Sequence, residues 1–360
     1  MALKSSHYGL ILAGGRGTRF WPRSRRARAK QILPFFGAES LIQQTVRRLR
    51  PVLPPERIWV LTNGYLRAEI VRQLPEVPRK QILAEPVGRN TAPAIGLVAR
   101  ILHSLDQGAV MGVFPADHYI TRPTRFLRMV RSAFRAAGSG NLAVLGIQPM
   151  WPETGYGYIE FPPGFEVGST NAVPTLSFRE KPGIETAKKF VEAGNFCWNA
   201  GMFFGRAGVF LEALRLYLPK TATLLAGLPP FASRAFAAKL KQVFPLCESI
   251  SIDYAVMEKA GNVVGLAADN VGWNDVGSWN AVYELARRDR NGNASRSEMI
   301  QQSSSGNYVD AADKLVALLG VKDLIIVDTP DALLVADRGQ AQKVGGLVKL
   351  LEKQKRDRLL

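Results

Sequence analysis

Four short apolar runs alternate with helical patterns through the first half of the chain. The apolar runs are YGLILA (8–13), RIWVLT (57–62), VMGVFPAD (110–117) and LAVLGI (142–147), and the helical patterns lie at 40–50, 65–74, 91–105 and 123–137. Strands that alternate with helices predict an α/β fold with a Rossmann-like, mostly parallel sheet flanked by helices. Sheets of this kind bind their ligands beyond the carboxyl ends of the strands.

The pattern loosens after about residue 150. Gly- and aromatic-rich segments such as GYGYIEF and FCWNAGMFF alternate there with helical patterns at 183–193 and 207–217, which predicts a second lobe over the sheet. The polar stretch RNGNASRSEMIQQSSSGN (290–307) has the composition of a linker, and short strand patterns and an amphipathic end follow it. We therefore predict a large domain over 1–295 and a small β-rich C-terminal domain over 296–360.

Positive charge is concentrated near the N-terminus. The formal net charge is +17, and residues 1–60 contribute +10 of it, because this segment has twelve Lys and Arg residues and only two acidic residues, Glu39 and Glu56. A basic protein can bind nucleic acid or anionic membranes, but this chain has no zinc-finger spacing, RNP-type aromatic motif or heptad repeat. A basic pocket for a polyphosphate explains the clustering more economically, so we expect neither nucleic acid nor a membrane as a partner.

Two further features narrow the class of protein. Cys197 and Cys247 stand in unrelated contexts without the spacing of metal ligands, so they predict neither a disulfide framework nor a zinc site. No apolar run approaches the roughly 20 residues that span a bilayer, and the start MALKSSHYG lacks the apolar centre of a signal peptide. We therefore expect a cytoplasmic protein.

The loop behind the first apolar run is rich in glycine. Gly14, Gly15 and Gly17 leave room for backbone N–H groups to approach an anion without a Cβ in the way. The dinucleotide fingerprint would need a glycine where the chain has Phe20, and the Walker pattern is absent as well. The loop therefore predicts a phosphate site that is neither an NAD site nor a P-loop.

Basic side chains accompany these glycines. Arg16, Arg19 and Lys30 can reach back over the loop and neutralise phosphates, the arginines with a bidentate fork and the lysine as a point charge. The alternative is a solvated basic loop. The position of Gly-Gly-x-Gly-Thr-Arg directly behind a strand favours phosphate binding.

The stretch LAGGRGTRFWPRSRRARAKQIL resembles the signature of the sugar nucleotidyltransferases, and within them that of the mannose-1-phosphate guanylyltransferases. That signature reads approximately L-A-G-G-x-G-T-R-x-W-P-x-S-R, followed by Pro-Lys-Gln. Here Ala29 replaces the usual proline, and Arg23 stands where leucine is common. The resemblance continues in the family's order over about residues 8–290, through EPVGRNTAPAI (85–95), FPADH (114–118), TGYGYIE (154–160), FREKP (178–182), WNAGMFF (198–204), SIDYAVMEK (251–259) and WNDVGSW (273–279).

The resemblance implies a nucleotide site around the first strand and the start of the helix at 91–105. From the residues alone, Asn90 or Thr91 caps that helix, and the same helix end offers free N–H groups to a ligand. Glu85, Asn90 and the backbone of Arg89 would contact base edges; the family implies guanine, while the residue chemistry leaves other bases open. The expected nucleotide-binding residues are Leu12, Ala13, Gly14, Gly15, Gly17, Thr18, Arg19, Lys30, Glu85, Arg89, Asn90 and Thr91.

Two aspartates are the candidate metal ligands. Asp117 ends a buried-looking strand, and Mg²⁺ favours such a carboxylate when a triphosphate supplies other oxygens. A turn aspartate that caps the next segment is the alternative. Asp275 is assigned to the same metal centre by resemblance, although it could equally cap a helix that starts near Ser278.

Three further blocks suggest a sugar-phosphate site. Gly155 and Tyr156 would lie against a sugar ring, with an ordinary β-hairpin as the alternative. Glu180 and Lys181 would alternate faces in an extended segment, so that Glu180 accepts from sugar hydroxyls and Lys181 approaches the phosphate. Asn199 is a further hydroxyl partner by resemblance, whereas SIDYAVMEK is interpreted as an amphipathic helix and Asp253 is given no firm role.

The implied reaction transfers GMP from GTP to α-D-mannose 1-phosphate and yields GDP-mannose and pyrophosphate, with Mg²⁺ as cofactor. Arg19, Lys30 and Asp117 are the expected catalytic residues. The second pKa of a phosphate monoester is about 6, so the nucleophile is already ionised and needs none of His7, His103 or His118 as a base. The alternatives are transfer from UTP, dTTP or ATP to glucose 1-phosphate, or a non-catalytic sugar-nucleotide sensor. The family also suggests a homodimer.

Overall fold

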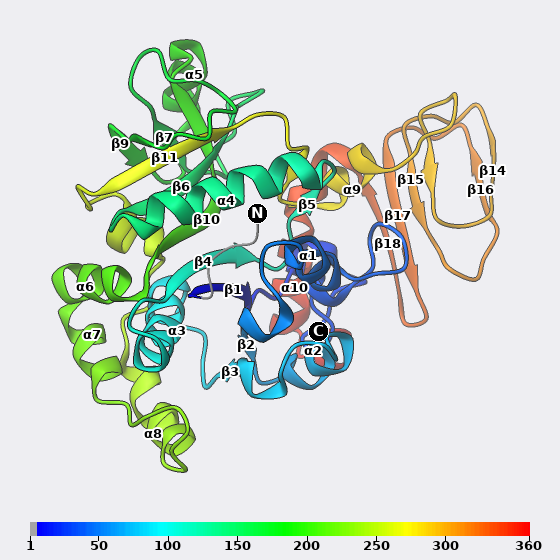
Figure 1. Cartoon of the computed structure of the whole chain (residues 1–360). Coiled ribbons are helices and arrows are strands. Elements are labelled where there is room, and N and C mark those ends of the chain that lie inside the picture. Colours follow the sequence, from blue (N-terminus) through cyan, green and yellow to red (C-terminus); the bar gives the residue numbers. More distant parts are fainter. Residues whose placement is uncertain (1–5) are drawn as a thin grey trace.

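A computed structural model describes residues 6–360 and is built around one large mixed sheet (Figure 1). The sheet has ten strands, eight of them in the order β3-β2-β1-β4-β10-β6-β11-β8. The pairs among β1 to β4 and the pair β6–β11 are parallel. The predicted fold class is confirmed. The strands are β1 His7–Ala13, β2 Ile58–Asn63, β3 Ile82–Glu85, β4 Val110–Pro115, β6 Leu142–Ile147, β7 Tyr158–Glu160, β8 Val173–Pro174, β9 Ser177–Arg179, β10 Phe196–Arg206 and β11 Val263–Ala268.

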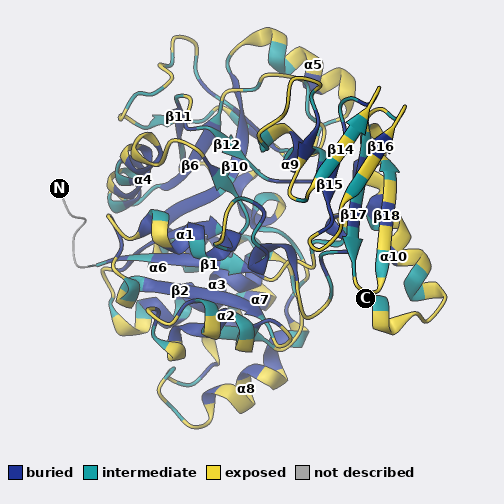
Figure 2. Ribbon diagram, turned by 90° about the vertical axis from the view of Figure 1, so that its right-hand side faces the viewer, coloured by how far each residue is buried: buried dark blue, intermediate teal, exposed yellow. Residues whose placement is uncertain are grey.

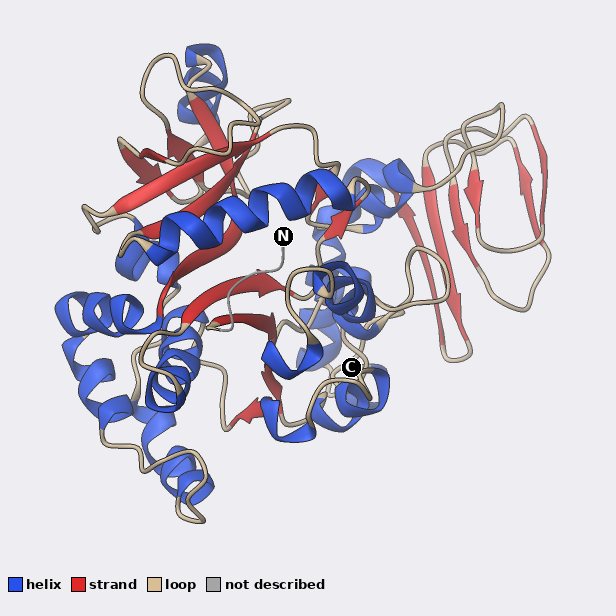
Figure 3. Cartoon of the chain, in the orientation of Figure 1, coloured by secondary structure: helices blue, strands red, loops and turns tan. Residues whose placement is uncertain are grey.

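Helices cover both faces of this sheet (Figure 3). Their starts follow local chemistry: Ser40 caps α1 with a complete capping box to Gln43, and the side chain of Asn90 accepts from the backbone of Thr91 at the start of α3. The helices expected in the first half are all present within one or two residues. The helices are α1 Leu41–Leu49, α2 Arg67–Gln73, α3 Thr91–Leu105, α4 Pro123–Gly138, α5 Ile184–Ala193, α6 Ala207–Tyr217, α7 Pro219–Ala226, α8 Phe236–Val243 and α9 Trp279–Leu285.

The antiparallel strand β10 joins the sheet to the second lobe. It is inserted between β4 and β6, and its register shifts between Asn199 and Phe203, where Gly201 has a φ of 64°. Before the shift, β10 also pairs with β7, which in turn pairs with β9. The irregularity therefore places Asn199 at the junction between the second lobe and the main sheet.

The C-terminal part is a coil of short strands (Figure 2). It contains two small sheets, one in the order β13-β15-β17-β18 and one formed by β14 and β16. Buried Asn293 and Asn307 stack between successive turns, with Asn307 Nδ2 donating to Asn293 Oδ1 at 2.9 Å. The linker prediction for 290–307 is wrong, because this stretch forms the first turn of the coil. The strands are β13 Ala294–Ser295, β14 Met299–Gln302, β15 Tyr308–Asp310, β16 Val316–Leu319, β17 Leu324–Thr329 and β18 Ala332–Asp337.

A short 3-10 helix, η7 (Arg338–Lys343), and helix α10 (Val344–Lys353) follow the coil. Figure 1 shows α10 away from β14 and β16, and it packs on the short helix η1 (Thr18–Phe20). One apolar cluster joins the two parts of the chain, with Phe20 and Trp279 on one side and Tyr308 and Val344 on the other. Across residues 6–360, none of the helices has the length and apolar character needed to cross a membrane.

Candidate active site

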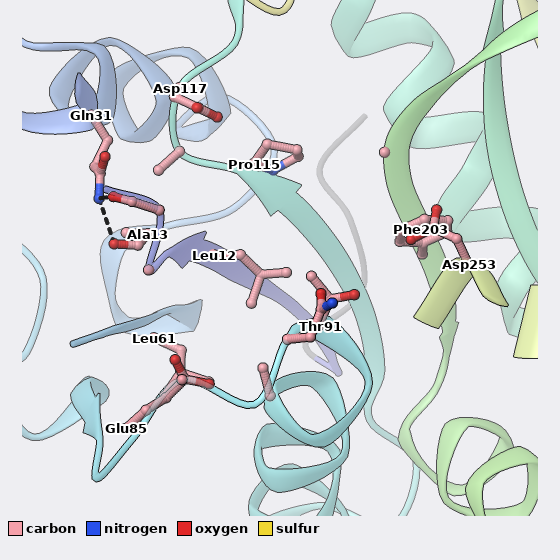
Figure 4. A pocket seen from close by; sticks show the side chains of 17 residues that line it. Leu12, Ala13, Gln31, Leu61, Glu85, Thr91, Pro115, Asp117, Phe203 and Asp253 are labelled. Atoms are coloured by element: carbon pink, nitrogen blue, oxygen red, sulfur yellow. Dashed lines mark hydrogen bonds between the residues drawn. The ribbon is translucent and has the colours of Figure 1, made fainter. Parts of the chain in front are cut away.

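A cavity of about 470 Å³ opens at the carboxyl ends of the parallel strands (Figure 4). This is the edge at which sheets of this class bind ligands. Figure 4 shows Asp117 and Gln31 on one side of the cavity, Glu85 on another, and Asp253 with Phe203 on a third. The lining residues are Leu12, Ala13, Gly14, Gly15, Gln31, Leu61, Glu85, Gly88, Asn90, Thr91, Ala94, Pro115, Ala116, Asp117, Gly201, Phe203 and Asp253.

The signature loop (residues 14–30) folds tightly against its own end. Gly17 has a φ of 61°, and a Cβ at this position would lie only 2.5 Å from the Cβ of Lys30, so only glycine fits here. Gln31 Nε2 donates to the carbonyl oxygens of Ala13 and Gly15 at 2.6 and 3.1 Å. Gly14 and Gly15 line the cavity, whereas Gly17, Thr18, Arg19 and Lys30 are not among its lining residues. Gln31 was not among the predicted site residues, although its place beside Lys30 in the signature pointed to it.

Lys30 connects two loops that are far apart in the sequence. Its Nζ donates to Asp117 Oδ2 at 2.8 Å and to the carbonyl oxygen of Asp275 at 2.6 Å. Its side chain is 8% exposed, against 35% for Asp117. Burial is the largest single effect and opposes ionisation of Asp117, but the Lys30 ammonium, the neighbouring His118 and the hydrogen bonds together hold the pKa of this carboxyl below its usual value. Asp117 is therefore an ionised group with one face open to the cavity.

The donor chemistry around Asp117 suits Mg²⁺. The described residues contain no group of three or more His, Cys, Asp or Glu side chains that could hold a metal unaided. Mg²⁺ is usually bound by one or two carboxylates together with substrate phosphates and water, so a lone ionised aspartate at the edge of a phosphate loop fits it. Asp275 contributes less directly: its Oδ1 accepts from the Tyr156 hydroxyl at 2.7 Å. It does not cap α9, whose N-cap is Ser278.

Glu85 has an unsatisfied carboxylate at the cavity wall. Its Oε1 is buried and has no hydrogen-bond partner among the residues that the structure describes. Burial raises the pKa of Glu85 to about 7. A buried acceptor without a partner destabilises the empty protein, so a ligand that supplies a donor to Oε1 gains binding energy here.

The far wall contains a residue without a predicted role. Asp253 lines the cavity, and its Oδ1 accepts from Asn199 Nδ2 at 2.8 Å. Burial raises the pKa of Asp253, and burial together with the charge of Asp253 also raises the pKa of Glu180. Asp253 begins a π-helical turn (Asp253–Met257), where an ordinary amphipathic helix was expected. The preceding residue, Ile252, donates its N–H to the Thr91 hydroxyl at 2.8 Å, which fixes the turn against α3.

Other predicted residues lie differently from expectation. Lys181 does not alternate faces with Glu180, because it has a φ of 48° and its ammonium pairs with the Glu180 carboxylate. Arg89, whose backbone was expected at the base, is not among the residues that line the cavity, and its guanidinium donates to the carbonyl oxygen of Pro245. Neither Gly155 nor Tyr156 lines the cavity, and the Tyr156 hydroxyl donates to Asp275, which does not line it either.

The basic residues of the signature loop have partners that the sequence did not suggest. Arg23 makes a bidentate pair with buried Asp310, and Arg25 pairs with Asp331 at 2.9 Å. Both acids belong to the C-terminal part of the chain. The expectation that a polyphosphate explains the whole basic cluster is therefore wrong for these two arginines, which attach one part of the protein to the other.

Two family models match the chain. The nucleotidyl transferase model matches residues 8–292, and the mannose-phosphate isomerase/GMP-like beta-helix domain model matches residues 297–351. The chain therefore belongs to the nucleotidyl transferase family. Within this family it groups with the mannose-1-phosphate guanylyltransferases, which confirms the resemblance seen in its motifs.

The relatives cover almost the whole chain. A mannose-1-phosphate guanylyltransferase of Salmonella montevideo is 38% identical over 96% of this chain and 74% of its own length. One from Escherichia coli strain K12 is 37% identical over 97% of this chain and 74% of its own length. Among solved structures, a protein of Thermus thermophilus described as a "mannose-1-phosphate geranyltransferase" superposes with a TM-score of 0.85 at 33% identity, covering 96% of this chain and 99% of that one.

Proposed function

We propose that this protein transfers GMP from GTP to α-D-mannose 1-phosphate and releases pyrophosphate, forming GDP-mannose. The observation that carries the proposal is that one cavity combines a glycine-rich phosphate loop, an ionised Asp117 paired with Lys30, and the unsatisfied carboxylate of Glu85. The loop would bind the phosphates of GTP, Asp117 would bind the divalent ion, and Glu85 would bind the base.

Glu85 favours guanine among the common bases. Guanine presents its N1–H and its exocyclic N2 amine side by side, and a carboxylate can accept both in a bidentate pair. Adenine, uracil and thymine each present an acceptor next to their single ring or amine donor on that edge, which would face the negative charge. A carboxylate at this position therefore selects GTP over ATP, UTP or dTTP.

The chemistry asks little of a general base. An oxygen of the sugar phosphate attacks the α-phosphorus while the bond to the bridging oxygen of pyrophosphate breaks, and the attacking oxygen is already ionised at neutral pH. The protein must hold two anions in line and stabilise the charge that develops on the leaving group. Lys30 and Arg19 are the proposed cations for this role. His118 is not needed as a base; burial lowers its pKa to about 4, and its Nδ1 accepts from Trp273.

Asp117, with Asp275 as the second candidate, would hold Mg²⁺. When bound, the ion offsets phosphate charge and orients the α-phosphate. Lys30 prepares this position in the absence of ligand, since it fixes the Asp117 carboxylate and the Asp275 backbone from one nitrogen. These roles follow from donor type and position.

The proposed sugar-phosphate site consists of Asp253, which lines the cavity, and of Asn199 and Glu180, which are not among the lining residues. Asn199 is held by Asp253, and Glu180 presents a buried Oε2 that has no partner within the described part of the chain. Carboxylate and amide oxygens accept from sugar hydroxyls, so these three side chains match a hexose ring. Lys181 pairs with Glu180 and is the proposed cation for the sugar phosphate.

A single assay tests the proposal. Pyrophosphate release is measured with Mg²⁺ for GTP, UTP, dTTP and ATP, each with mannose 1-phosphate and with glucose 1-phosphate. Release is expected with GTP and mannose 1-phosphate above every other pair. A faster pair would assign another sugar nucleotidyltransferase, and tight GDP-mannose binding without turnover would instead identify a sensor.

The remaining expectations are proposals of the same kind. GTP and a sugar phosphate are cytoplasmic metabolites, which supports a cytoplasmic location. We also propose that the protein is a homodimer and that it binds no nucleic acid. The ion pairs of Arg23 with Asp310 and of Arg25 with Asp331 support the second point, because they occupy part of the basic cluster. Sedimentation and a salt-dependent gel shift test these two points.

A further inference from the structure

The end of the chain contacts the arginines next to the phosphate loop. Arg19 Nη1 donates to Gln342 Oε1 at 2.6 Å, and Arg16 Nη2 pairs with Glu352 Oε1 at 2.8 Å. Gln342 lies in η7 and Glu352 near the end of α10. Gly345 lets α10 approach closely, because a Cβ there would lie 3.3 Å from the Thr18 hydroxyl. The contacts therefore belong to a packed interface and reach the two arginines from its edge.

The two contacts differ in charge. The Gln342 amide is a neutral acceptor, so it orients the Arg19 guanidinium and leaves its positive charge available. Glu352 is an anion and competes with any phosphate for Arg16; it also lies 3.9 Å from Arg26. Arg16 and Glu352 are 47% and 33% exposed, so their attraction is screened by salt.

Other contacts also attach the C-terminal part. Arg23 with buried Asp310, Arg25 with Asp331, and the Trp21 indole N–H to the carbonyl oxygen of Leu359 make that attachment elsewhere on the same loop. The shared apolar cluster adds to it. Gln342 and Glu352 differ from these contacts in their partners, which are the two arginines closest to the glycines.

We propose that Gln342 is a positioning residue that presents Arg19 to the triphosphate, and that Glu352 is a competing anion that weakens triphosphate binding through Arg16. The proposal rests on the proposed function, because it takes a nucleoside triphosphate as the ligand of the loop. The C-terminal segment thereby adjusts the phosphate site without contacting the cavity.

In two of the test variants, Gln342→Glu and Glu352→Gln, the expected effects on attachment and on catalysis have opposite signs. Gln342→Glu adds charge to the contact with Arg19, so it strengthens attachment, yet it neutralises the arginine; kcat/KM for GTP is expected to fall about 10-fold and to recover partly when salt rises from about 0.05 to about 0.5 M. Gln342→Ala is expected to lower kcat/KM about 5-fold without that salt-dependent recovery. Glu352→Gln weakens attachment but is expected to lower the KM for GTP about 3-fold.

Asp331→Asn is the matched control, because it removes an ion pair between the same loop and the same part of the chain, away from the glycines. It should lower the melting temperature about as much as Glu352→Gln and leave kcat and KM for GTP unchanged. If Gln342→Glu is as active as the unaltered protein, or if Glu352→Gln raises the KM, the two residues serve attachment only and the proposal is overturned. An inactive unaltered protein would instead overturn the proposed function, and direct binding of GTP to the variants would still decide the inference.

Discussion

Lys30 is the residue on which the geometry of the candidate site depends most. It is almost fully buried, it is packed against Gly17, and it holds Asp117 and the Asp275 backbone together. Lys30→Ala and Asp117→Ala are each expected to reduce turnover at least about 100-fold, the scale of losing one main electrostatic contact to the transition state. Pyrophosphate release measures this effect.

The control for these variants is Lys349→Ala, which removes an exposed lysine of α10, and circular dichroism checks that each variant is folded. Near-normal pyrophosphate release from folded Lys30→Ala or Asp117→Ala would remove these residues from the mechanism.

Glu85 predicts a pH dependence of base recognition. The carboxylate form accepts from guanine, and the neutral form does not; with a pKa of about 7, the accepting form is lost as the pH falls through neutrality. The KM for GTP is therefore expected to rise about 10-fold from one pH unit above that pKa to one unit below it. Steady-state kinetics across this range measures the change.

Glu85→Gln is the control, because its amide cannot titrate. The variant should lose this pH step and also lose about 10-fold or more of the preference for GTP over ITP, which lacks the N2 amine. A pH step that persists in Glu85→Gln belongs to the nucleotide or to another group, and Glu85 would then have no part in base recognition.

At the scale of elements, strands and helices of the first half follow directly from local pattern. The apolar runs at 8–13, 57–62, 110–117 and 142–147 have no competing periodicity and coincide with β1, β2, β4 and β6 within a few residues, and α1 and α3 carry their own caps. The signature loop was also predictable from local sequence. Its Gly17 has a positive φ and packs against Lys30, so only glycine fits there, and the requirement is visible in the sequence as a glycine.

What local pattern could not give are features set by distant partners. The π-helical turn at Asp253 depends on Thr91 and Asn199, which fix it from two other elements. The pairing of Glu180 with Lys181 depends on the positive φ of Lys181. The C-terminal coil repeats at intervals of 14 to 17 residues, as in Asn293 above Asn307 and Tyr308 above Ile325, and its polar turns have the composition of a linker.

The π-helical turn makes a prediction of its own. Asp253→Asn replaces one carboxylate oxygen by an NH2 group, so one acceptor for sugar hydroxyls is lost at this position. It also weakens the hydrogen bond that orients the side chain of Asn199, the second acceptor. The KM for mannose 1-phosphate is expected to rise about 10-fold, with the KM for GTP unchanged. Tyr254→Phe, on the same turn with an exposed ring, should change neither value. An equal rise in both KM values would place Asp253 outside the sugar-phosphate site.

At the scale of the whole molecule, the two parts of the chain share one core. Trp279 is fully buried; its ring lies 5.3 Å from that of Phe20 and 5.8 Å from that of Tyr308, between centroids, and its Nε1 donates to the carbonyl oxygen of Trp21 at 3.1 Å. The signature loop thus packs on residues from both sides of position 295. The division into domains 1–295 and 296–360 stays a prediction about the chain, and this shared core predicts that the two parts unfold together.

Thermal unfolding followed by tryptophan fluorescence and by far-UV circular dichroism should therefore show one coincident transition. Trp279→Ala removes the centre of the shared core and is expected to lower the free energy of unfolding by about 3 to 5 kcal/mol. Both signals should then show their transition at the same, lower temperature. Trp151→Ala, at a site where the ring is 44% exposed, should cost much less. If Trp279→Ala instead splits the transition in two, the C-terminal coil is stable by itself. The apolar cluster that it shares with the signature loop is then an interface between two independent domains.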